Sequence, residues 1–222
     1  MSTSIRIRKG LDIRLKGEAE KVLVQADPAK VIAIKPTDFH GLIPKVLVKQ
    51  GAKVKAGDPL FGDKYNERIL FTSPVSGVVE DVVRGDKRKV LEVRVVADAS
   101  IAYEDFGAGD PSTMNRETVV QKLLKSGVWP VIRQRPFDLV ADPAKEPKSI
   151  FVSCFDTNPL APDLDYIVHN HGNEFQTGLN ALSKLTKGKV NIVVNSKTAA
   201  REFLDAKNVV RQTVDGPHPA GN

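Results

Sequence analysis

One short stretch of the chain combines residue types that can hold a flat aromatic ligand. The segment from Trp129 to Phe137 contains the only tryptophan of the sequence, two arginines and a phenylalanine, with prolines beside both rings. Aromatic rings can stack on a planar ligand while Arg133 or Arg135 donates a hydrogen bond to a carbonyl oxygen. The alternative is a hydrophobic plug that packs a helix against a sheet and leaves the arginines in solvent. The residue types are compatible with both interpretations.

Polar loops follow two predicted strands. The loop that begins at Asp156 and includes Asn158 follows the apolar run 149–155, and a second loop, 195–197, follows the run 190–194. Ligands of open α/β sheets collect beyond the carboxyl ends of the strands, so we expect both loops and the aromatic segment at one edge. A dinucleotide would need a glycine-rich turn there, because glycine lets backbone amides approach the pyrophosphate. Neither loop contains such a turn, which disfavours dinucleotide binding.

The other reactive side chains predict no catalytic or metal site. Cys154 is the only cysteine, which excludes an intrachain disulfide and a multi-cysteine metal or iron–sulfur site within this chain. Its apolar surroundings predict a buried structural thiol. His169 and His171 are two residues apart in a predicted helix, about 200° around its axis, so they cannot bind one ion together. Asp163 and Asp165 are interpreted as helix-start charges.

Two kinds of pattern divide the chain. They predict a barrel-sandwich β domain over residues 1–108, followed by a Rossmann-like parallel α/β domain over residues 109–222. Short strands in the first part are expected at 22–24, 31–34 and 90–96. The second part alternates helices and strands, which predicts a parallel sheet. Its elements are a helix after residue 111 that Gly127 ends, strand 149–155, helix 165–185, strand 190–194, helix 198–206 and strand 209–210. Because the chain ends in a loop after a strand, we expect a fragment of a longer polypeptide.

The β domain resembles the biotinyl and lipoyl carrier fold, in which two similar halves are joined by a hairpin. Glycines at turn positions and aliphatic residues between them mark the halves, at 48–60 and 73–79. The hairpin, 62–68, has neither the Met-Lys-Met nor the Asp-Lys-Ala sequence of a modified lysine. Lys64 is therefore interpreted as a solvated turn lysine, and a prosthetic group on Lys64 is the alternative.

The net charge of +6 is concentrated near the start of the chain, where residues 1–64 contain 13 Lys and Arg against 7 Asp and Glu. A basic surface can meet anionic lipid, an acidic partner protein or nucleic acid. Nucleic acid is disfavoured because no recognised reading module or aromatic platform accompanies the lysines. Apolar runs are far shorter than the roughly 20 residues that cross a bilayer, and no signal peptide is visible. These features predict a soluble, cytoplasmic chain.

The order of several short motifs resembles one family over nearly the whole chain. The motifs are Leu60-Phe61-Gly62-Asp63-Lys64, Phe71-Thr72-Ser73-Pro74-Val75-Ser76-Gly77, Leu123-Leu124-Lys125-Ser126-Gly127-Val128-Trp129, Arg133-Gln134-Arg135-Pro136-Phe137, Phe155-Asp156-Thr157-Asn158-Pro159-Leu160-Ala161 and Gly216-Pro217-His218-Pro219-Ala220-Gly221. Their sequence is similar to that of the A subunits of the sodium-translocating NADH:quinone reductase (Na⁺-NQR). The Asp-Thr-Asn-Pro-Leu-Ala and Gly-Pro-His-Pro-Ala-Gly stretches are the most specific.

The resemblance implies a peripheral subunit on the cytoplasmic face of the bacterial inner membrane, which reaches the membrane only through other subunits of its complex. That complex passes electrons from NADH through flavins and iron–sulfur centres to ubiquinone or menaquinone and exports Na⁺. The resemblance also implies that this subunit has no tightly or covalently bound cofactor and no iron–sulfur centre of its own.

Relatives of the family hold FMN through a glycine-rich turn after a similar helix. This chain has Val128, Trp129 and Arg133 in that turn, so we expect the FMN site to be lost. The family's association with quinone implies candidate quinone contacts at Trp129, Arg133, Arg135, Phe137, Asp156 and Asn158. We expect the isolated fragment to be inactive. The alternatives are a lipoyl-type carrier domain and a purely structural docking subunit.

Overall fold

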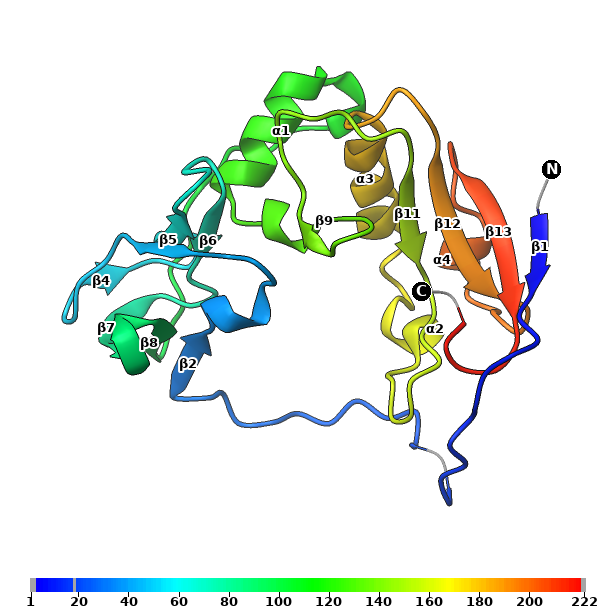
Figure 1. The fold of residues 1–222 in the computed structure, drawn as a ribbon, viewed down its shortest axis with the longest axis horizontal. Coiled ribbons are helices and arrows are strands. Elements are labelled where there is room, and N and C mark those ends of the chain that lie inside the picture. The colour runs from blue at the N-terminus through cyan, green and yellow to red at the C-terminus, as the bar shows by residue number, and fades with distance from the viewer. Residues whose placement is uncertain (1–2, 18, 221–222) are drawn as a thin grey trace. The chain divides into compact units, whose positions relative to one another are not determined.

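A computed structural model describes residues 3–17 and 19–220 of the chain (Figure 1). The fold has two compact units. The described residues of the first, here called the α/β unit, lie in Met1–Val24, Asp110–Arg116 and Glu146–Asn222. The second, the β unit, comprises Gln25–Gly109 and Glu117–Lys145. This division differs from the predicted boundary after residue 108, because each unit draws on stretches from both sides of that boundary.

The α/β unit is built on a four-stranded sheet with the order β1-β13-β12-β11. The strands are β1 (Thr3–Arg6), β11 (Ile150–Ser153), β12 (Val190–Asn195) and β13 (Val210–Asp215). All three neighbouring pairs are parallel, which confirms the parallel sheet predicted from the alternation of elements. β12 is central and almost continuously buried, as expected for a strand of a parallel sheet with both faces covered.

Helices pack against this sheet through one apolar cluster. They are α2 (Leu164–Ile167), α3 (Gly172–Ser183) and α4 (Arg201–Leu204). Leu179 of α3 and Phe203 of α4 are buried together with Cys154 and with Ile192 of β12. The rings of Phe175 and Phe203 meet edge to face, 5.1 Å between centroids.

Two of the predicted helices are shorter than expected. The helix predicted at 165–185 is interrupted between α2 and α3, where Asn170 has φ 66°, a left-handed conformation that a right-handed helix does not contain. His169 and His171 therefore lie in a turn region and not in a continuous helix. The helix predicted at 198–206 is reduced to α4, because side-chain hydrogen bonds hold residues 195–200 as a loop.

The N-terminal part of the chain also differs from its prediction. The strand predicted at 22–24 is wrong, since Leu23 is 92% exposed and this segment has no neighbouring strand in the described part of the chain. Residues that favour strands do not form one without a neighbouring strand, and their backbone N–H and C=O groups then bond to water. Conversely, β1 is a strand that the sequence pattern does not predict, although it pairs with β13, which is more than 200 residues later in the sequence.

Two antiparallel sheets form most of the β unit. One has the order β2-β8-β7-β4, from β2 (Val31–Ile34), β4 (Lys53–Val54), β7 (Gly77–Arg84) and β8 (Val90–Ala97). The other has the order β3-β5-β6, from β3 (Pro44–Val46), β5 (Pro59–Asp63) and β6 (Leu70–Thr72). The strands predicted at 31–34 and 90–96 and the hairpin predicted at 62–68 are confirmed.

The core of the β unit lies between these sheets. Its fully buried side chains include Leu60, Phe61, Val79, Val93 and Val95. The ring of Phe61 stacks on Phe71 at 4.8 Å between centroids, and Phe71 meets Phe39 edge to face at 4.6 Å. Three aromatic rings therefore form one continuous packing contact.

The remaining elements of the β unit follow a helix. α1 (Arg116–Lys125) is followed by the 3₁₀ turn η4 (Trp129–Val131) and by a hairpin of β9 (Arg133–Gln134) and β10 (Leu139–Val140). Gly127 has φ 72°, and a Cβ there would lie 2.3 Å from Thr72 Oγ1. The prediction that Gly127 ends this helix is confirmed. Two further short turns of the β unit are η1 (Pro36–Asp38) and η2 (Asp86–Arg88), whereas the 3₁₀ turn η3 (Pro111–Thr113) belongs to the α/β unit.

Candidate functional site

The carboxyl edge of the parallel sheet gathers four loops. Because β1, β11, β12 and β13 all run in the same direction, the residues that follow them emerge at one edge (Figure 1). The loop that begins at Asp156 and the loop 195–197 both lie at this edge, as the sequence predicted. The aromatic segment 129–137 belongs to the β unit and does not follow a strand of this sheet.

A threonine and a histidine connect two of these loops. Thr157 Oγ1 lies 2.9 Å from His218 Nδ1 and accepts a hydrogen bond from the Ala220 N–H at 3.1 Å. The His218 N–H donates to Asp12 Oδ1 at 2.8 Å. Gly10 packs on the same histidine, since a Cβ there would lie 2.2 Å from the His218 carbonyl oxygen. The loops after β1, β11 and β13 are thus tied together around His218.

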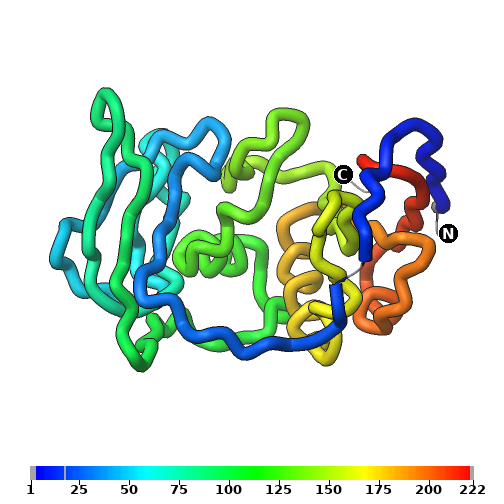
Figure 2. Tube along the Cα trace, turned by 90° about the horizontal axis from the view of Figure 1, so that it is seen from below, coloured from blue at the N-terminus to red at the C-terminus, as the bar shows by residue number. Residues whose placement is uncertain are grey.

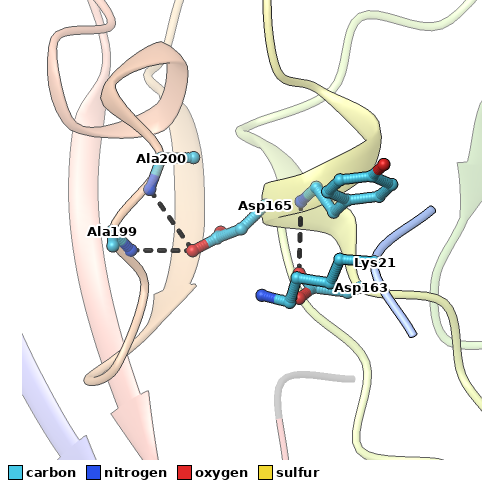
Figure 3. Close-up of polar contacts among 6 residues, drawn as sticks. Lys21, Asp163, Asp165, Ala199 and Ala200 are labelled. Atoms are coloured by element: carbon cyan, nitrogen blue, oxygen red, sulfur yellow. Dashed lines mark hydrogen bonds and ion pairs between the residues drawn. The ribbon is translucent and has the colours of Figure 1, made fainter. Parts of the chain in front are cut away.

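Two acidic residues near α2 have different roles (Figure 3). Asp163 caps α2 by accepting from the Tyr166 N–H, and Lys21 Nζ lies 2.6 Å from Asp163 Oδ2. The ion pair with Lys21 is the main reason why the pKa of Asp163 is lowered. Asp165 Oδ2 instead accepts from the N–H groups of Ala199 at 2.7 Å and Ala200 at 3.3 Å. Both acids are helix-start charges as predicted, since Asp163 caps α2 and Asp165 lies in its first turn. Asp165 also holds the loop after β12 against α2.

Several backbone amides of this edge bond to the chain's own side chains. The Asn158 N–H donates to Asp156 Oδ1 at 2.8 Å, and the Lys197 N–H donates to Asn195 Oδ1 at 2.9 Å. The bonds from Asn158 lower the pKa of the Asp156 carboxyl. A pyrophosphate needs free amides pointing at it. These amides, like those bound by Asp12 and Asp165, are therefore not free to hold a pyrophosphate.

An apolar pocket of about 410 Å³ lies beside the sheet in the α/β unit. Its polar groups come from Ser153, His171 and Glu174, and most of its remaining surface is apolar. It is lined by Ser153, Cys154, Leu164, Ile167, Val168, His171, Glu174, Phe175 and Phe203. Cys154 is only 2% exposed, and burial raises its pKa to about 12. The predicted structural thiol is therefore confirmed.

We expect native Cys154 to react with a soluble thiol reagent at pH 8 at least about 100-fold more slowly than in the unfolded chain. The thiolate is the reacting species, and an ordinary cysteine has a pKa near 8.5, so both burial and the raised pKa slow the reaction. The rate is measured by intact mass after timed alkylation, with the chain in denaturant as the control. Equal rates in the two samples would contradict a buried thiol.

The six candidate quinone contacts divide between the two units. Trp129 is 3% exposed and its Nε1–H donates to the Ala141 carbonyl at 2.7 Å, so it packs as the plug alternative requires. The Arg133 guanidinium lies 5.1 Å from the Phe39 ring centroid and donates to the carbonyl oxygens of Asp38 and Asp138. Phe137, which is 72% exposed, and Arg135 lie in the turn between β9 and β10.

The other two candidates, Asp156 and Asn158, lie at the sheet edge of the α/β unit. Asn158 Nδ2 donates to Asp156 Oδ2 at 3.1 Å. The structure thus brings together Asp156 with Asn158, and separately Arg135 with Phe137. The tie between Thr157 and His218 was not predicted. The Gly-Pro-His-Pro motif marked one side of it, but no local signal identified a partner 61 residues away.

Comparison with protein families identifies the family of the chain, which the geometry of the sheet edge alone does not. Residues 5–98 match the family model described as "NqrA N-terminal barrel-sandwich hybrid domain", and residues 114–222 match "NqrA second alpha/beta domain". The chain belongs to the NqrA family. The β unit accordingly contains most of the barrel-sandwich hybrid domain, as the resemblance to carrier domains implied.

Curated NqrA proteins align with nearly all of the chain. Each of them is named as the A subunit of the Na(+)-translocating NADH-quinone reductase. The protein from Marinomonas sp. (strain MWYL1) is 37% identical over 97% of the chain, and that from Tolumonas auensis is 38% identical over 98%. The protein from Cellvibrio japonicus is 36% identical over 98%. The chain spans 48–49% of the length of these relatives.

The described residues provide neither a membrane span nor a metal cluster. No helix within residues 3–17 and 19–220 has the length and apolar character needed to span a bilayer. The same residues contain no group of three or more His, Cys, Asp and Glu side chains arranged to hold a metal ion.

Proposed function

We propose that this NqrA family member is a peripheral part of a Na⁺-translocating NADH:quinone reductase and contributes to quinone binding and to assembly of the complex. The observation that carries the proposal is the order of the two matched domains, which together account for most of the chain. Curated NqrA relatives align with both domains. The proposed partners are the other subunits of that complex and ubiquinone or menaquinone, and the proposed location is the cytoplasmic face of the bacterial inner membrane.

The α/β unit is proposed to be Rossmann-like without a nucleotide or flavin of its own. Five of its sheet-edge amides bond to the side chains of Asp12, Asp156, Asp165 and Asn195. The turn where relatives hold FMN belongs here to the β unit, and its Trp129 is buried and donates to the Ala141 carbonyl. A flavin ring or phosphate would have to displace this packed side chain. These contacts support a subunit that binds substrate and partners without carrying electrons on its own cofactor.

The turn between β9 and β10 is the best supported quinone contact among the predicted residues. Phe137 offers an exposed ring, and Arg135 is an exposed cation two residues away. Stacking of the ring and a charge-assisted hydrogen bond to a quinone oxygen would each contribute about 1–2 kcal/mol. Trp129 and Arg133 already have partners, so they position the hairpin that presents Phe137. Asp156 and Asn158 remain proposed contacts from the α/β unit.

Replacing Phe137 by alanine is expected to weaken binding of a quinone analogue roughly tenfold, because one stacking contact is lost. Thermal stability should change little, since the side chain is mostly exposed. Binding is titrated with the full-length subunit in its complex. Tyr103→Ala is the matched control, because Tyr103 is an equally exposed ring of the same unit.

Unchanged binding in Phe137→Ala would remove the β9–β10 turn from the quinone site. If the assembled complex then still required this subunit for stability but no variant of it altered quinone affinity, the purely structural docking role would be the better description. The carrier alternative makes a separate prediction of added mass on Lys64. Lys64 is exposed in the turn after β5, and its N–H donates to the Ile43 carbonyl at 2.8 Å.

A further inference from the structure

The turn that joins β7 and β8 concentrates positive charge in a few residues. Its sequence, 84–89, contains Arg84, Lys87, Arg88 and Lys89 against a single acid, Asp86. All five charged residues are exposed. Within the part of the chain that the structure describes, none of these cations has an ion-pair partner. Figure 2 shows the hairpin standing clear of the other strands of the β unit. The cluster does not appear in the net charge of longer stretches of sequence, because acidic residues elsewhere balance its positive charge.

The backbone of the same turn is strained by its residue types. The Lys89 N–H donates to the Asp86 carbonyl, and the two residues between them, Lys87 and Arg88, have φ values of 52° and 62°. Positive φ at both central positions is the geometry of a type I′ hairpin turn, for which Asn-Gly is the favoured pair. Residues with a Cβ and a long side chain are disfavoured there. Strained conformations of this kind cluster at functional sites. The chain thus places two cations where they cost conformational free energy.

We propose that this turn, residues 84–89, is a docking point for the anionic surface of a phospholipid bilayer. The proposal rests on the proposed function in one respect, since a peripheral subunit of a membrane complex is held close to a bilayer. A specific protein interface normally has a buried apolar or aromatic centre. The turn has no aromatic residue and no exposed large apolar side chain between Arg84 and Lys89. A plane of anionic headgroups requires only exposed cations and no matching shape.

The contact is expected to be weak, which suits a role in orienting the β unit at the membrane. Each Lys or Arg near an anionic membrane contributes a modest attraction that salt screens. Four cations and one acid on an isolated chain therefore give weak, salt-reversible binding. In an assembled complex the same turn would act at high effective concentration, because the rest of the complex already holds the subunit near the membrane. The contact would then select one orientation of the β unit.

The test uses sedimentation of the chain with vesicles of phosphatidylglycerol and phosphatidylcholine, compared with pure phosphatidylcholine. Lys87→Asn combined with Arg88→Gly should weaken binding to the anionic vesicles about thirtyfold, for the loss of two cations. The same variant should raise the thermal midpoint of the β unit by about 5 °C, because Asn-Gly relieves the strain. Lys64→Ala combined with Arg68→Ala is the control, since it removes two cations from the β5–β6 turn of the same unit.

Each outcome bears on the proposal. Preference for anionic vesicles that depends on residues 87 and 88 but not on 64 and 68 supports it. Equal binding to neutral and anionic vesicles overturns it, because the anionic headgroups would then not be recognised. Equal loss in both double variants overturns it in favour of an effect of net charge. A turn variant that keeps vesicle binding but no longer assembles with the rest of the complex also overturns it and identifies an acidic protein surface as the partner. Quinone binding is a separate measurement, so a failure of the proposed function is distinguishable.

Discussion

Replacing Phe61 by alanine is expected to destabilise the β unit by about 3–5 kcal/mol, enough to unfold a large fraction of the protein. The Phe61 ring is completely buried, and it stacks on Phe71. Alanine removes this contact and leaves a cavity that the two flanking strands, β3 and β6, cannot close without breaking their pairing with β5. The only tryptophan, Trp129, is buried in the same unit, so its fluorescence during denaturant unfolding reports the loss.

Tyr65→Ala is the control for this experiment. Tyr65 lies in the turn that follows β5 and is 77% exposed, so its removal should change the unfolding free energy by less than about 0.5 kcal/mol. A Phe61→Ala protein with the denaturation midpoint of the parent would show that the buried Phe61 ring and its stack on Phe71 do not stabilise the β unit.

The β unit shows where sequence patterns predict structure well. Glycines at turns and aliphatic residues between them correctly indicated β2, β8 and the β5–β6 hairpin, because each of these depends on local residue types and on a partner strand within the same unit. The segment 22–24 has the same strand-forming composition but no partner strand among the described residues, and it remains exposed. Strand propensity describes how well a residue suits a pleated surface, and it cannot supply the neighbouring strand.

The α/β unit shows the limit set by contacts distant in sequence. Apolar periodicity indicated one helix at 165–185, but Asp165 accepts hydrogen bonds from Ala199 and Ala200, more than 30 residues away, and the chain turns at Asn170. β1 pairs with β13 across almost the entire sequence. Neither interaction leaves a periodic pattern in a local window, so a single sequence does not reveal them.

For the candidate sites, too, the sequence predicted what depends on local residue types and not what depends on contacts distant in sequence. Residue types identified a segment with exposed Phe137 and Arg135, but only the fold shows that Trp129 and Arg133 are already engaged by Ala141 and Phe39. The strand-exit rule correctly placed Asp156 at the edge of the parallel sheet. Several amides of this edge bond to side chains from loops that follow different strands. The sequence indicates only those bonds whose two partners are two residues apart.

Replacing Ile192 by alanine is expected to destabilise the α/β unit by about 2–5 kcal/mol. Ile192 is fully buried at the middle of β12, the strand that pairs with β11 on one side and β13 on the other. Its side chain belongs to the cluster that joins the sheet to Leu179 of α3 and Phe203 of α4. Truncating the side chain to Cβ at this point weakens both the sheet and its helical cover. Hydrogen exchange of the β12 amides measures the effect, because their slowest exchange follows opening of the sheet.

Ile192→Val distinguishes a packing effect from a change in strand propensity. Valine is also β-branched and removes a single methylene, so it should cost about 0.5–1.5 kcal/mol at the same position. The graded series from isoleucine to valine to alanine is therefore expected to speed exchange in β12 in two steps, the second larger than the first. If alanine and valine gave the same exchange rates, the cost would not follow the volume removed. The cluster around Ile192 would then not be the contact that holds α3 and α4 on the sheet, and the loops at its carboxyl edge would have to be positioned by their own hydrogen bonds around Thr157 and His218.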